Sequence, residues 1–321
     1  MDAPDLLMPV RMAAPVIAAL EVRFRLHRLW EQDDREAFLT SVGPRIRGVA
    51  VSPAFGPVDA ALFERLPALE IVASFGVGYD YIDAAAAAER DVVVTNTPGV
   101  LDDEVADLTI GLLLATIRRI PQADRFLRDG RWHDGSFPLS PTLRGQRIGI
   151  VGLGHIGKAV ARRLDGFGLA VAYHGRHRQA DVAYTHYGSV VALAEASDVL
   201  IVVVPGGSAT RHLIDAAVLR ALGSNGVLIN VSRGSVVDQA ALIEALREGM
   251  IQAAGLDVYE DEPDVPEALI ALDNTVLLPH IGSASVETRA AMGQLVVDNL
   301  VSWFDGNGAV TPVAESRLLI A

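Results

Sequence analysis

The sequence contains no cysteine, which excludes disulfides, thiolate metal sites and a cysteine nucleophile. Its 27 Lys and Arg residues stand against 40 Asp and Glu residues, and the formal net charge is -13. Such an acidic chain has no broad basic surface for the phosphate backbone of a nucleic acid or for anionic lipid. We therefore expect neither nucleic acid nor a membrane as a partner.

Long apolar runs are also missing. The longest ones, such as residues 109–117, fall far short of the roughly 20 residues that a membrane-spanning helix needs. Residues 1–20 carry early acids and internal prolines instead of a basic stretch followed by an apolar core, so we expect no signal peptide. Metal-ligating side chains show no clustering, so we expect no metal site. We predict a cytoplasmic protein, in agreement with the lack of cysteine.

The sequence does contain a regular alternation of two kinds of segment. Short runs rich in valine and isoleucine alternate with longer segments of helical spacing, which is typical of parallel strands joined by crossover helices. The alternation occurs twice, and 321 residues are enough for two domains. Strands are predicted in the first half at 7–10, 24–29, 48–52, 71–75 and 92–95. Strands are predicted in the second half at 147–151, 170–174, 199–204, 226–231, 253–258 and 275–278.

Two breaks in this alternation predict the domain boundaries. Asn96-Thr97-Pro98-Gly99 stops a strand and a helix at 101–120 follows, so we place a hinge there. Near the end of the chain, a helix at 286–304 leads to a short tail that would pack usefully only against the first domain. The first domain is therefore expected to be discontinuous.

These patterns predict an α/β protein with two Rossmann-like domains, each built on a doubly wound parallel sheet. The first domain, which is flavodoxin-like, comprises residues 1–99 and 284–321. The second is inserted into it and comprises residues 100–283.

The first candidate site is a glycine motif between a buried-strand pattern and a helical segment at 158–167. The motif consists of Gly152, Leu153, Gly154, His155, Ile156 and Gly157. In this setting the three glycines permit a tight turn, close approach of a pyrophosphate and close packing of helix on strand. Amides at the helix N-terminus, those of His155 and Ile156, are expected to donate to the phosphates. We predict a dinucleotide site, and the alternative is a plain glycine-rich turn.

The next strand end indicates which dinucleotide is bound. NAD enzymes usually carry Asp or Glu there to hold the ribose 2'-hydroxyl. This sequence instead has His174, Gly175, Arg176, His177 and Arg178. Guanidinium groups of Arg176 and Arg178 would attract a 2'-phosphate. We predict a preference for NADP(H), with NAD(H) possible; the alternative is a solvated surface loop.

Three residues that each follow a predicted strand form the candidate catalytic set. Reduction of a 2-oxo acid needs a cation for the carboxylate, a proton donor for the carbonyl oxygen and a group that keeps the donor protonated. Arg233, His280 and Glu262 supply these functions in that order. Taken singly, each has a plain structural alternative: a loop arginine, a capping histidine or a surface acid. Their joint occurrence at strand ends, which face the ligand crevice in such sheets, favours catalysis.

Several segments, in this order and spacing, complete a family pattern: Phe75-Gly76-Val77-Gly78-Tyr79-Asp80, Asn96-Thr97-Pro98-Gly99, the glycine motif, Asn230-Val231-Ser232-Arg233-Gly234, Leu256-Asp257-Val258 and Pro279-His280-Ile281-Gly282-Ser283-Ala284. Over almost its whole length the sequence resembles the D-isomer-specific 2-hydroxyacid dehydrogenases. Within that family it is similar to the glyoxylate, hydroxypyruvate and hydroxyphenylpyruvate reductases. The resemblance implies that the catalytic Arg, Glu and His of the family correspond to Arg233, Glu262 and His280.

The resemblance also implies the roles of the two domains. The discontinuous domain would bind the substrate, with the backbone amides of Val77 and Gly78 on its carboxylate. The inserted domain would bind NAD(P), and the two chains of a homodimer would join through it. Beyond the glycine motif and the arginines, the expected cofactor contacts are His174, Gly175, Val204, Pro205, Val231, Ser232, Asp257 and Gly282.

The expected function is an NADP(H)-preferring reductase of small 2-oxo acids, of the glyoxylate and hydroxypyruvate type, that yields D-2-hydroxy acids. One alternative is an NAD-linked dehydrogenase such as a phosphoglycerate dehydrogenase, which the missing strand-end acid and the lack of room for a regulatory domain disfavour. Another is a hydroxyphenylpyruvate reductase, since small pocket changes discriminate weakly between acids.

Two further alternatives lie farther away. Formate dehydrogenases share the fold but pair their histidine with an amide, whereas Glu262 is an acid. A nucleotide-sensing corepressor can be built on the same scaffold, since a fold alone does not prove catalysis. The sequence also departs from the family at Asp107, where many members carry Glu or Asn, and it does not predict what this changes.

Overall fold

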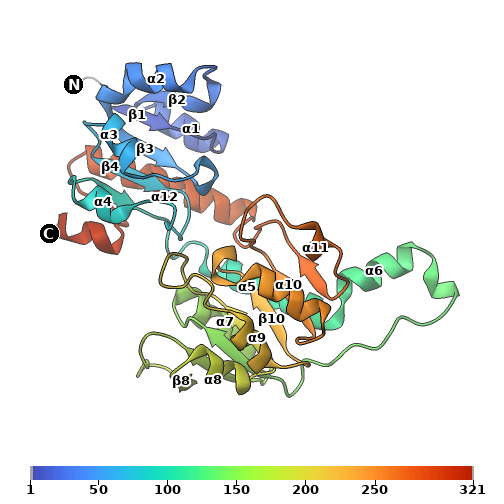
Figure 1. Cartoon of the computed structure of the whole chain (residues 1–321). Coiled ribbons are helices and arrows are strands. Elements are labelled where there is room, and N and C mark those ends of the chain that lie inside the picture. Colours follow the sequence, from blue (N-terminus) through green and yellow to red (C-terminus); the bar gives the residue numbers. More distant parts are fainter. Residues whose placement is uncertain (1–2, 320–321) are drawn as a thin grey trace. The chain divides into compact units, whose positions relative to one another are not determined.

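The computed structural model describes residues 3–319 and divides into two compact units (Figure 1). Unit 1 comprises Met1–Leu101 and Ser285–Ala321, and unit 2 comprises Asp102–Ala284. The sequence predicted these boundaries at 99/100 and 283/284. In the described part of the chain, no helix is both long and apolar enough to cross a membrane.

Unit 1 is built on a five-stranded parallel sheet in the order β2-β1-β3-β4-β5. Its strands are β1 Asp5–Met8, β2 Arg25–Arg28, β3 Ile46–Val51, β4 Ile71–Ser74 and β5 Val93–Thr95. Its helices are α1 Ala14–Glu21, α2 Arg35–Val42, α3 Ala60–Arg65, α4 Ala84–Ala88 and α12 Val286–Phe304, and a 3-10 turn η6 spans Ala314–Leu319. The N-termini of α2, α3, α4 and α12 are capped by Asp34, Asp59, Asp83 and Ser285, whose side chains accept from backbone amides.

The strands of unit 1 send alternate side chains to two apolar layers, as the period of two in a strand requires. On one face, Leu7 and Val49 pack with α2, α3 and α4. On the other, Leu6 and Ala50 pack with α1 and with α12, the helix that returns from the end of the chain. The discontinuity of unit 1 therefore follows from burial: α12 has an apolar stripe, and the sheet of unit 1 has a face that needs covering.

Unit 2 is built on a seven-stranded parallel sheet in the order β12-β11-β10-β9-β6-β7-β8. Its strands are β6 Arg147–Val151, β7 Ala170–His174, β8 Thr185–Tyr187, β9 Val199–Val202, β10 Val227–Asn230, β11 Ala253–Leu256 and β12 Thr275–Leu277. Its helices are α5 Asp102–Arg118, α6 Ile120–Arg128, α7 His155–Asp165, α8 Val190–Glu195, α9 Ala216–Leu222, α10 Gln239–Arg247 and α11 Glu267–Ile270, and a 3-10 turn η5 spans Gly234–Val236.

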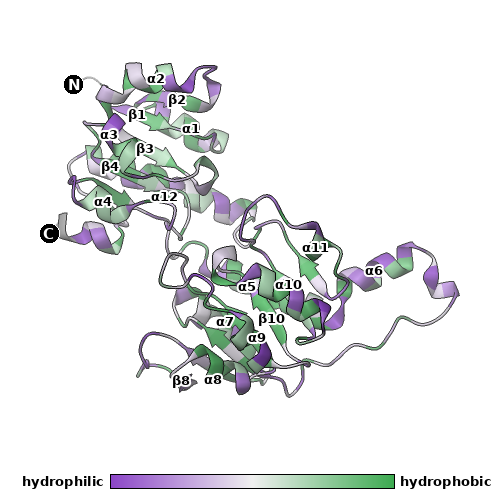
Figure 2. Cartoon of the chain, in the orientation of Figure 1, coloured by the Kyte–Doolittle hydropathy of each residue, from purple (hydrophilic) through white to green (hydrophobic). Residues whose placement is uncertain are grey.

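Helices cover both faces of this second sheet. One apolar layer lies between the strands and helices α5 and α7, and the other between the strands and helices α8 to α11. Figure 2 shows the hydrophobic residues concentrated in the strands of both sheets. The strand order reverses beside β6, which has β7 on one side and β9 on the other. In open α/β sheets such a reversal leaves a crevice at the carboxyl ends of the strands, where ligands bind.

The predicted two-sheet α/β class is confirmed, with differences in detail that have local causes. β1 ends at Met8, before Pro9, which has no N–H to donate to a neighbouring strand. The predicted helix at 101–120 ends at Arg118, because Arg119 takes a left-handed backbone with φ 53 and α6 begins after it. β8 was not predicted, because Thr185–Tyr187 is a short polar edge strand with no apolar run to reveal it.

Asp107, whose role the sequence left open, lies on α5 and pairs with α7. Nε of Arg163 donates to Oδ1 of Asp107 at 2.6 Å, and its Nη1 donates to Asp103 at 3.0 Å. The hydrogen bond from Arg163 holds the pKa of Asp107 below its ordinary value. In this structure Asp107 therefore joins two helices that cover the same face of the sheet.

Candidate active site

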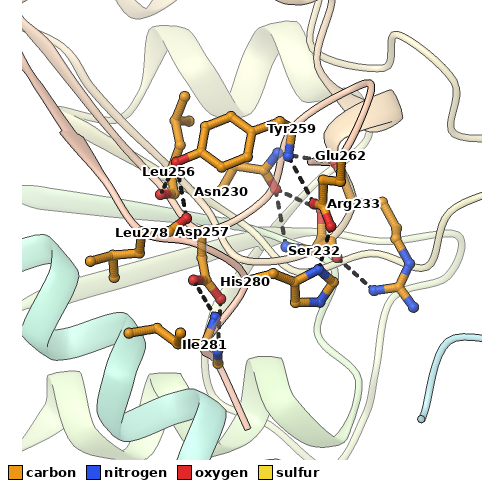
Figure 3. Close-up of polar contacts among 11 residues, drawn as sticks. Asn230, Ser232, Arg233, Leu256, Asp257, Tyr259, Glu262, Leu278, His280 and Ile281 are labelled. Carbon is orange, nitrogen blue, oxygen red and sulfur yellow. Dashed lines mark hydrogen bonds and ion pairs between the residues drawn. The ribbon is translucent and has the colours of Figure 1, made fainter. Parts of the chain in front are cut away.

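Three neighbouring strand ends of unit 2 bring the predicted catalytic residues together (Figure 3). β10, β11 and β12 are adjacent and parallel, so their carboxyl ends lie on one edge of the sheet. Arg233 follows β10, Glu262 follows β11 and His280 follows β12. The fold thus places a guanidinium, a carboxylate and an imidazole on the same edge.

A direct hydrogen bond joins two of these side chains. Nδ1 of His280 lies 2.7 Å from Oε2 of Glu262, and Oε1 of Glu262 accepts from the amide of Tyr259 at 3.0 Å. Because Nδ1 faces the carboxylate, Nε2 lies on the opposite side of the ring, where it can exchange a proton with a ligand. The carboxylate fixes both the orientation and the tautomer of the ring.

The ionisation of Glu262 suits this arrangement. Burial alone would raise the pKa of Glu262, but the hydrogen bond and charge of His280, with help from the Tyr259 amide and Arg233, hold that pKa below its ordinary value. The carboxylate is therefore ionised at neutral pH. An ionised carboxylate beside an imidazole stabilises positive charge on the ring.

Asp257 fixes the backbone that carries His280. Its side chain, only 2% exposed, accepts from the amide of Ile281 at 2.7 Å and from that of Gly282 at 2.8 Å. Burial raises the pKa of Asp257, although the two amides act in the opposite direction. His280 itself has a left-handed backbone with φ 53, which a residue other than glycine holds only when its surroundings impose it. In this structure Asp257 imposes it.

Asn230 fixes the backbone that carries Arg233. Its side chain, 1% exposed, accepts from the amide and hydroxyl of Ser232 at 3.1 and 2.8 Å and donates to the carbonyl of Arg233 at 3.1 Å. Gly234 then passes so close to Tyr259 that a Cβ at this position would lie 1.8 Å from its carbonyl atoms. Only glycine therefore allows the turn after Arg233 to pack against the loop that carries Glu262.

Tyr259 connects the loop that carries Glu262 with the chain before His280. Its hydroxyl donates to the carbonyl of Leu278 at 2.9 Å, while its amide holds Glu262. Burial, together with the charges of Asp257 and Glu262, raises the pKa of Tyr259 to about 12, so the hydroxyl remains a donor. Neither Tyr259 nor Asn230 was predicted as a site residue. Asn230 stands two residues before Ser232, a spacing typical of a side-chain turn, whereas nothing in the sequence marks Tyr259.

The glycine motif has a geometry that fits a dinucleotide. Gly152 has φ 100, and a Cβ there would lie 2.7 Å from the carbonyl oxygen of Val203. A Cβ at Gly157 would lie 2.1 Å from the carbonyl oxygen of Gly152, whereas one at Gly154 would project into open space. α7 begins at His155 without a capping side chain and without an acidic residue in its first turn. Its free N-terminal amides suit a pyrophosphate.

The loop after β7 carries the two predicted phosphate-binding arginines. Arg176 and Arg178 are exposed, and within residues 3–319 neither forms an ion pair or hydrogen bond. Gln179 holds this loop. Its backbone N–H donates to the hydroxyl of buried Tyr173 at 2.7 Å, and its side-chain Nε2 donates to the carbonyl of Leu153 at 2.7 Å. The second bond ties the arginine loop to the glycine motif. Gln179 was not predicted from the sequence.

The remaining predicted residues lie at other strand ends. Val204 and Pro205 follow β9, Val231 and Ser232 follow β10, and His174 ends β7 with its Nδ1 2.9 Å from the carbonyl oxygen of Tyr187. Val77 and Gly78, expected to hold the substrate carboxylate, follow β4 and belong to unit 1. The substrate and cofactor roles of all these residues stay predictions.

Comparisons with a family model, with curated proteins and with solved structures give consistent matches. The model of the D-isomer specific 2-hydroxyacid dehydrogenase NAD binding domain matches residues 110–282. Hydroxyphenylpyruvate reductase of Plectranthus scutellarioides is 48% identical over 313 residues, which is 98% of this chain and 100% of that protein. Glyoxylate/hydroxypyruvate reductase A of Arabidopsis thaliana is 47% identical over the same shares.

Solved structures of 2-hydroxyacid dehydrogenases and reductases are also similar to this chain. An NADPH-dependent glyoxylate/hydroxypyruvate reductase of Sinorhizobium meliloti, in complex with NADP and malonate, superposes with a TM-score of 0.93 at 51% identity and 98% coverage of each chain. A 2-hydroxyacid dehydrogenase of Ketogulonicigenium vulgare gives a TM-score of 0.91 at 42% identity, covering 98% of this chain and 99% of that one.

Replacing Glu262 by glutamine tests, without any substrate, whether the carboxylate of Glu262 is ionised beside His280. Because the pKa of Glu262 is lowered in the folded chain, its ionised form stabilises the fold above the unfolded pKa, and this contribution is lost as the pH falls through the folded pKa. We expect E262Q to unfold at lower urea concentration than the wild type at about pH 6, with the difference shrinking below about pH 4.

The matched control is E244Q on α10, since Glu244 is exposed and has no ion pair in the described part of the chain. Its difference from the wild type should be small and nearly constant with pH. A difference between E262Q and the wild type that does not change with pH would contradict the pairing.

Proposed function

Since the chain belongs to the D-isomer-specific 2-hydroxyacid dehydrogenase family, we propose that it is an NADP(H)-preferring reductase of small 2-oxo acids, of the glyoxylate and hydroxypyruvate type. The products would be D-2-hydroxy acids. The observation that carries the proposal is the His280–Glu262 hydrogen bond on the strand edge that also carries Arg233. A cytoplasmic location, expected from the sequence, remains part of this proposal.

The side chains have complementary tasks in the proposed reaction. The chemistry supplied by the bound nicotinamide is transfer of a hydride to C2 of the acid. Arg233 binds the substrate carboxylate and polarises the carbonyl. Binding of the substrate carboxylate by the amides of Val77 and Gly78, which belong to unit 1, is part of the same proposal. Nε2 of His280 gives a proton to the carbonyl oxygen and takes it back in the reverse direction. Glu262 stabilises the protonated ring.

The cofactor preference rests on the loop after β7. None of residues 174–178 at the strand end is a carboxylate, so none of them repels a 2'-phosphate or serves as the acid that holds a 2'-hydroxyl. Arg176 and Arg178 are exposed on a loop that Gln179 ties to the glycine motif, which would bring their charges to the ribose. The proposal therefore favours NADP(H) and leaves NAD(H) as a weaker cofactor.

Assays with a panel of 2-oxo acids test the proposal directly. We expect NADPH oxidation with glyoxylate and hydroxypyruvate, at a higher kcat/KM than with NADH or with hydroxyphenylpyruvate. In H280N the kcat should fall about 100- to 10,000-fold, since the proton donor is lost. Asparagine tolerates the left-handed backbone at this position, so the NADPH Kd should not change.

Two results would overturn the assignment. If no 2-oxo acid supports NADPH or NADH oxidation, the chain would be a nucleotide-binding protein on the same scaffold. If hydroxyphenylpyruvate has the highest kcat/KM, the substrate class would be aromatic, as in the Plectranthus scutellarioides relative.

The double variant R176A/R178A tests the cofactor preference. Loss of a charge-assisted contact to phosphate should raise the KM for NADPH at least about 10- to 100-fold. The KM for NADH, which lacks the phosphate, should change little. R220A is the control, because Arg220 is an exposed arginine on α9 of the same unit. Equal effects of R176A/R178A on both cofactors would refute the assignment.

We further propose a homodimer joined through unit 2, with α6 and the chain after it in the interface. None of the residues of α6 is buried, and this segment extends away from the sheet of unit 2 (Figure 1). It nevertheless carries large apolar side chains, with Leu127 55% and Trp132 67% exposed. Exposed apolar side chains gathered on one segment are typical of a contact between subunits.

Light scattering after size-exclusion chromatography measures the mass in solution. The wild type should have the mass of a dimer, and L127E/W132E should have that of a monomer, because two charges cannot be buried there without partners. V22E is the control, since Val22 is 82% exposed but lies in unit 1. A monomeric wild type, or a dimeric L127E/W132E, would contradict the proposed interface.

A further inference from the structure

The loop of residues 76–78, here called the carboxylate loop, has an unusual backbone arrangement. The amide of Thr97 donates to the carbonyl oxygen of Gly76 at 2.9 Å, and Nδ2 of Asn96 donates to that of Val77 at 2.8 Å. Two successive carbonyl groups therefore point to the same short segment. In an extended strand, successive carbonyls would point to opposite sides.

This arrangement fixes the direction of two N–H groups. The carbonyl of Gly76 shares a planar trans peptide with the N–H of Val77, and the carbonyl of Val77 shares one with the N–H of Gly78. Each N–H therefore points away from the segment that holds its carbonyl. Among the described residues, neither N–H has an acceptor. Successive N–H groups that converge in this way form an anion-binding concavity.

Asn96 is itself held by the C-terminal part of the chain. The hydroxyl of Thr311 donates to the carbonyl of Asn96 at 2.6 Å, and the amide of Asn96 donates to the carbonyl of Thr311 at 3.3 Å. The two residues are 215 positions apart in the sequence. A residue near the end of the chain thus determines where Asn96 lies.

Thr311 in turn is held by α12 through Asn299, which is 1% exposed. Oδ1 of Asn299 accepts from the amides of Val310 and Thr311 at 3.0 and 2.9 Å, and Nδ2 donates to the hydroxyl of Thr311 and the carbonyl of Leu295, both at 2.8 Å. These four bonds use the full capacity of the amide. The side chain of Asn299 therefore has one orientation available.

We propose that Asn96 and Thr311 are positioning residues that aim the amides of Val77 and Gly78 at the substrate carboxylate. The inference rests on the proposed function, in which these amides bind the carboxylate. The chain of hydrogen bonds from Asn299 through Thr311 and Asn96 keeps the donors directed before substrate arrives. Preorganised donors bind a charged group without the cost of ordering the loop.

This chain of hydrogen bonds from Asn299 through Thr311 and Asn96 is called the relay below. The variants T311V and T311S test it with small changes of shape. Valine keeps the branched shape but removes the hydroxyl, whereas serine keeps the hydroxyl. We expect T311V to raise the KM for glyoxylate and the Ki of oxamate, an unreactive 2-oxo acid analogue, about 10-fold in parallel. T311S should stay within about threefold of the wild type. The NADPH Kd, measured by fluorescence, should be unchanged in both.

S316A controls for the loss of a hydrogen bond in the same region. The hydroxyl of buried Ser316 accepts from the amide of Val94 at 2.9 Å, so it also ties the C-terminal segment to β5. It has no hydrogen bond to the carboxylate loop. S316A and T311V should lose similar thermal stability, but only T311V should weaken oxamate binding.

A double-mutant cycle tests whether Thr311 acts through Asn96. N96A should weaken oxamate binding at least as much as T311V, and adding T311V to N96A should weaken it little further. If T311V and N96A fold and keep the wild-type KM and Ki, or if their effects multiply in the double variant, the relay is wrong while the proposed activity stands. If the wild type neither reduces a 2-oxo acid nor binds oxamate, both proposals fail.

Discussion

The two hydrogen bonds from the amides of Ile281 and Gly282 to the buried carboxylate of Asp257 determine where His280 can lie. They keep His280 in a left-handed backbone, which costs on the order of 1 to 3 kcal/mol for a residue other than glycine. The ring then meets Glu262, whose loop is fixed by Tyr259 and by the close passage of Gly234. The histidine–carboxylate pair is therefore a product of backbone packing between strand ends, and the side chains alone would not bring it about.

A chain with a net charge of -13 must bind anionic ligands through local features. In the proposed function those features are largely backbone groups: the uncapped N-terminus of α7 and the N–H groups after β4. Backbone dipoles carry partial charge without adding a titratable group, and folding fixes their direction. In the proposed function, Arg233 supplies planar charge for a carboxylate, and Arg176 and Arg178 supply it for a phosphate.

The sequence predicted the two-sheet fold because that fold depends on local signals. The apolar runs at 147–151 and 170–174 match β6 and β7, and the helix at 286–304 matches α12. The signals failed where structure depends on single residues or on context. Pro9 ended β1 early, Arg119 turned left-handed and split the predicted helix, and the polar strand β8 forms only because β7 offers an edge.

In the candidate site, too, the predicted residues are marked by a local signal, and residues whose roles depend on distant contacts were not predicted. Arg233, Glu262 and His280 were predicted because each follows a strand, and parallel strands end on one edge. Asn230 was not, although its spacing from Ser232 is a local signal for a side-chain turn. Tyr259 was not either, because its role exists only once separate loops meet. The relay to the carboxylate loop is the extreme case: Asn96 and Thr311 are 215 residues apart, and no local pattern links them. A sequence motif can therefore identify the groups that contact a ligand, while the hydrogen bonds that aim those groups become visible only in three dimensions.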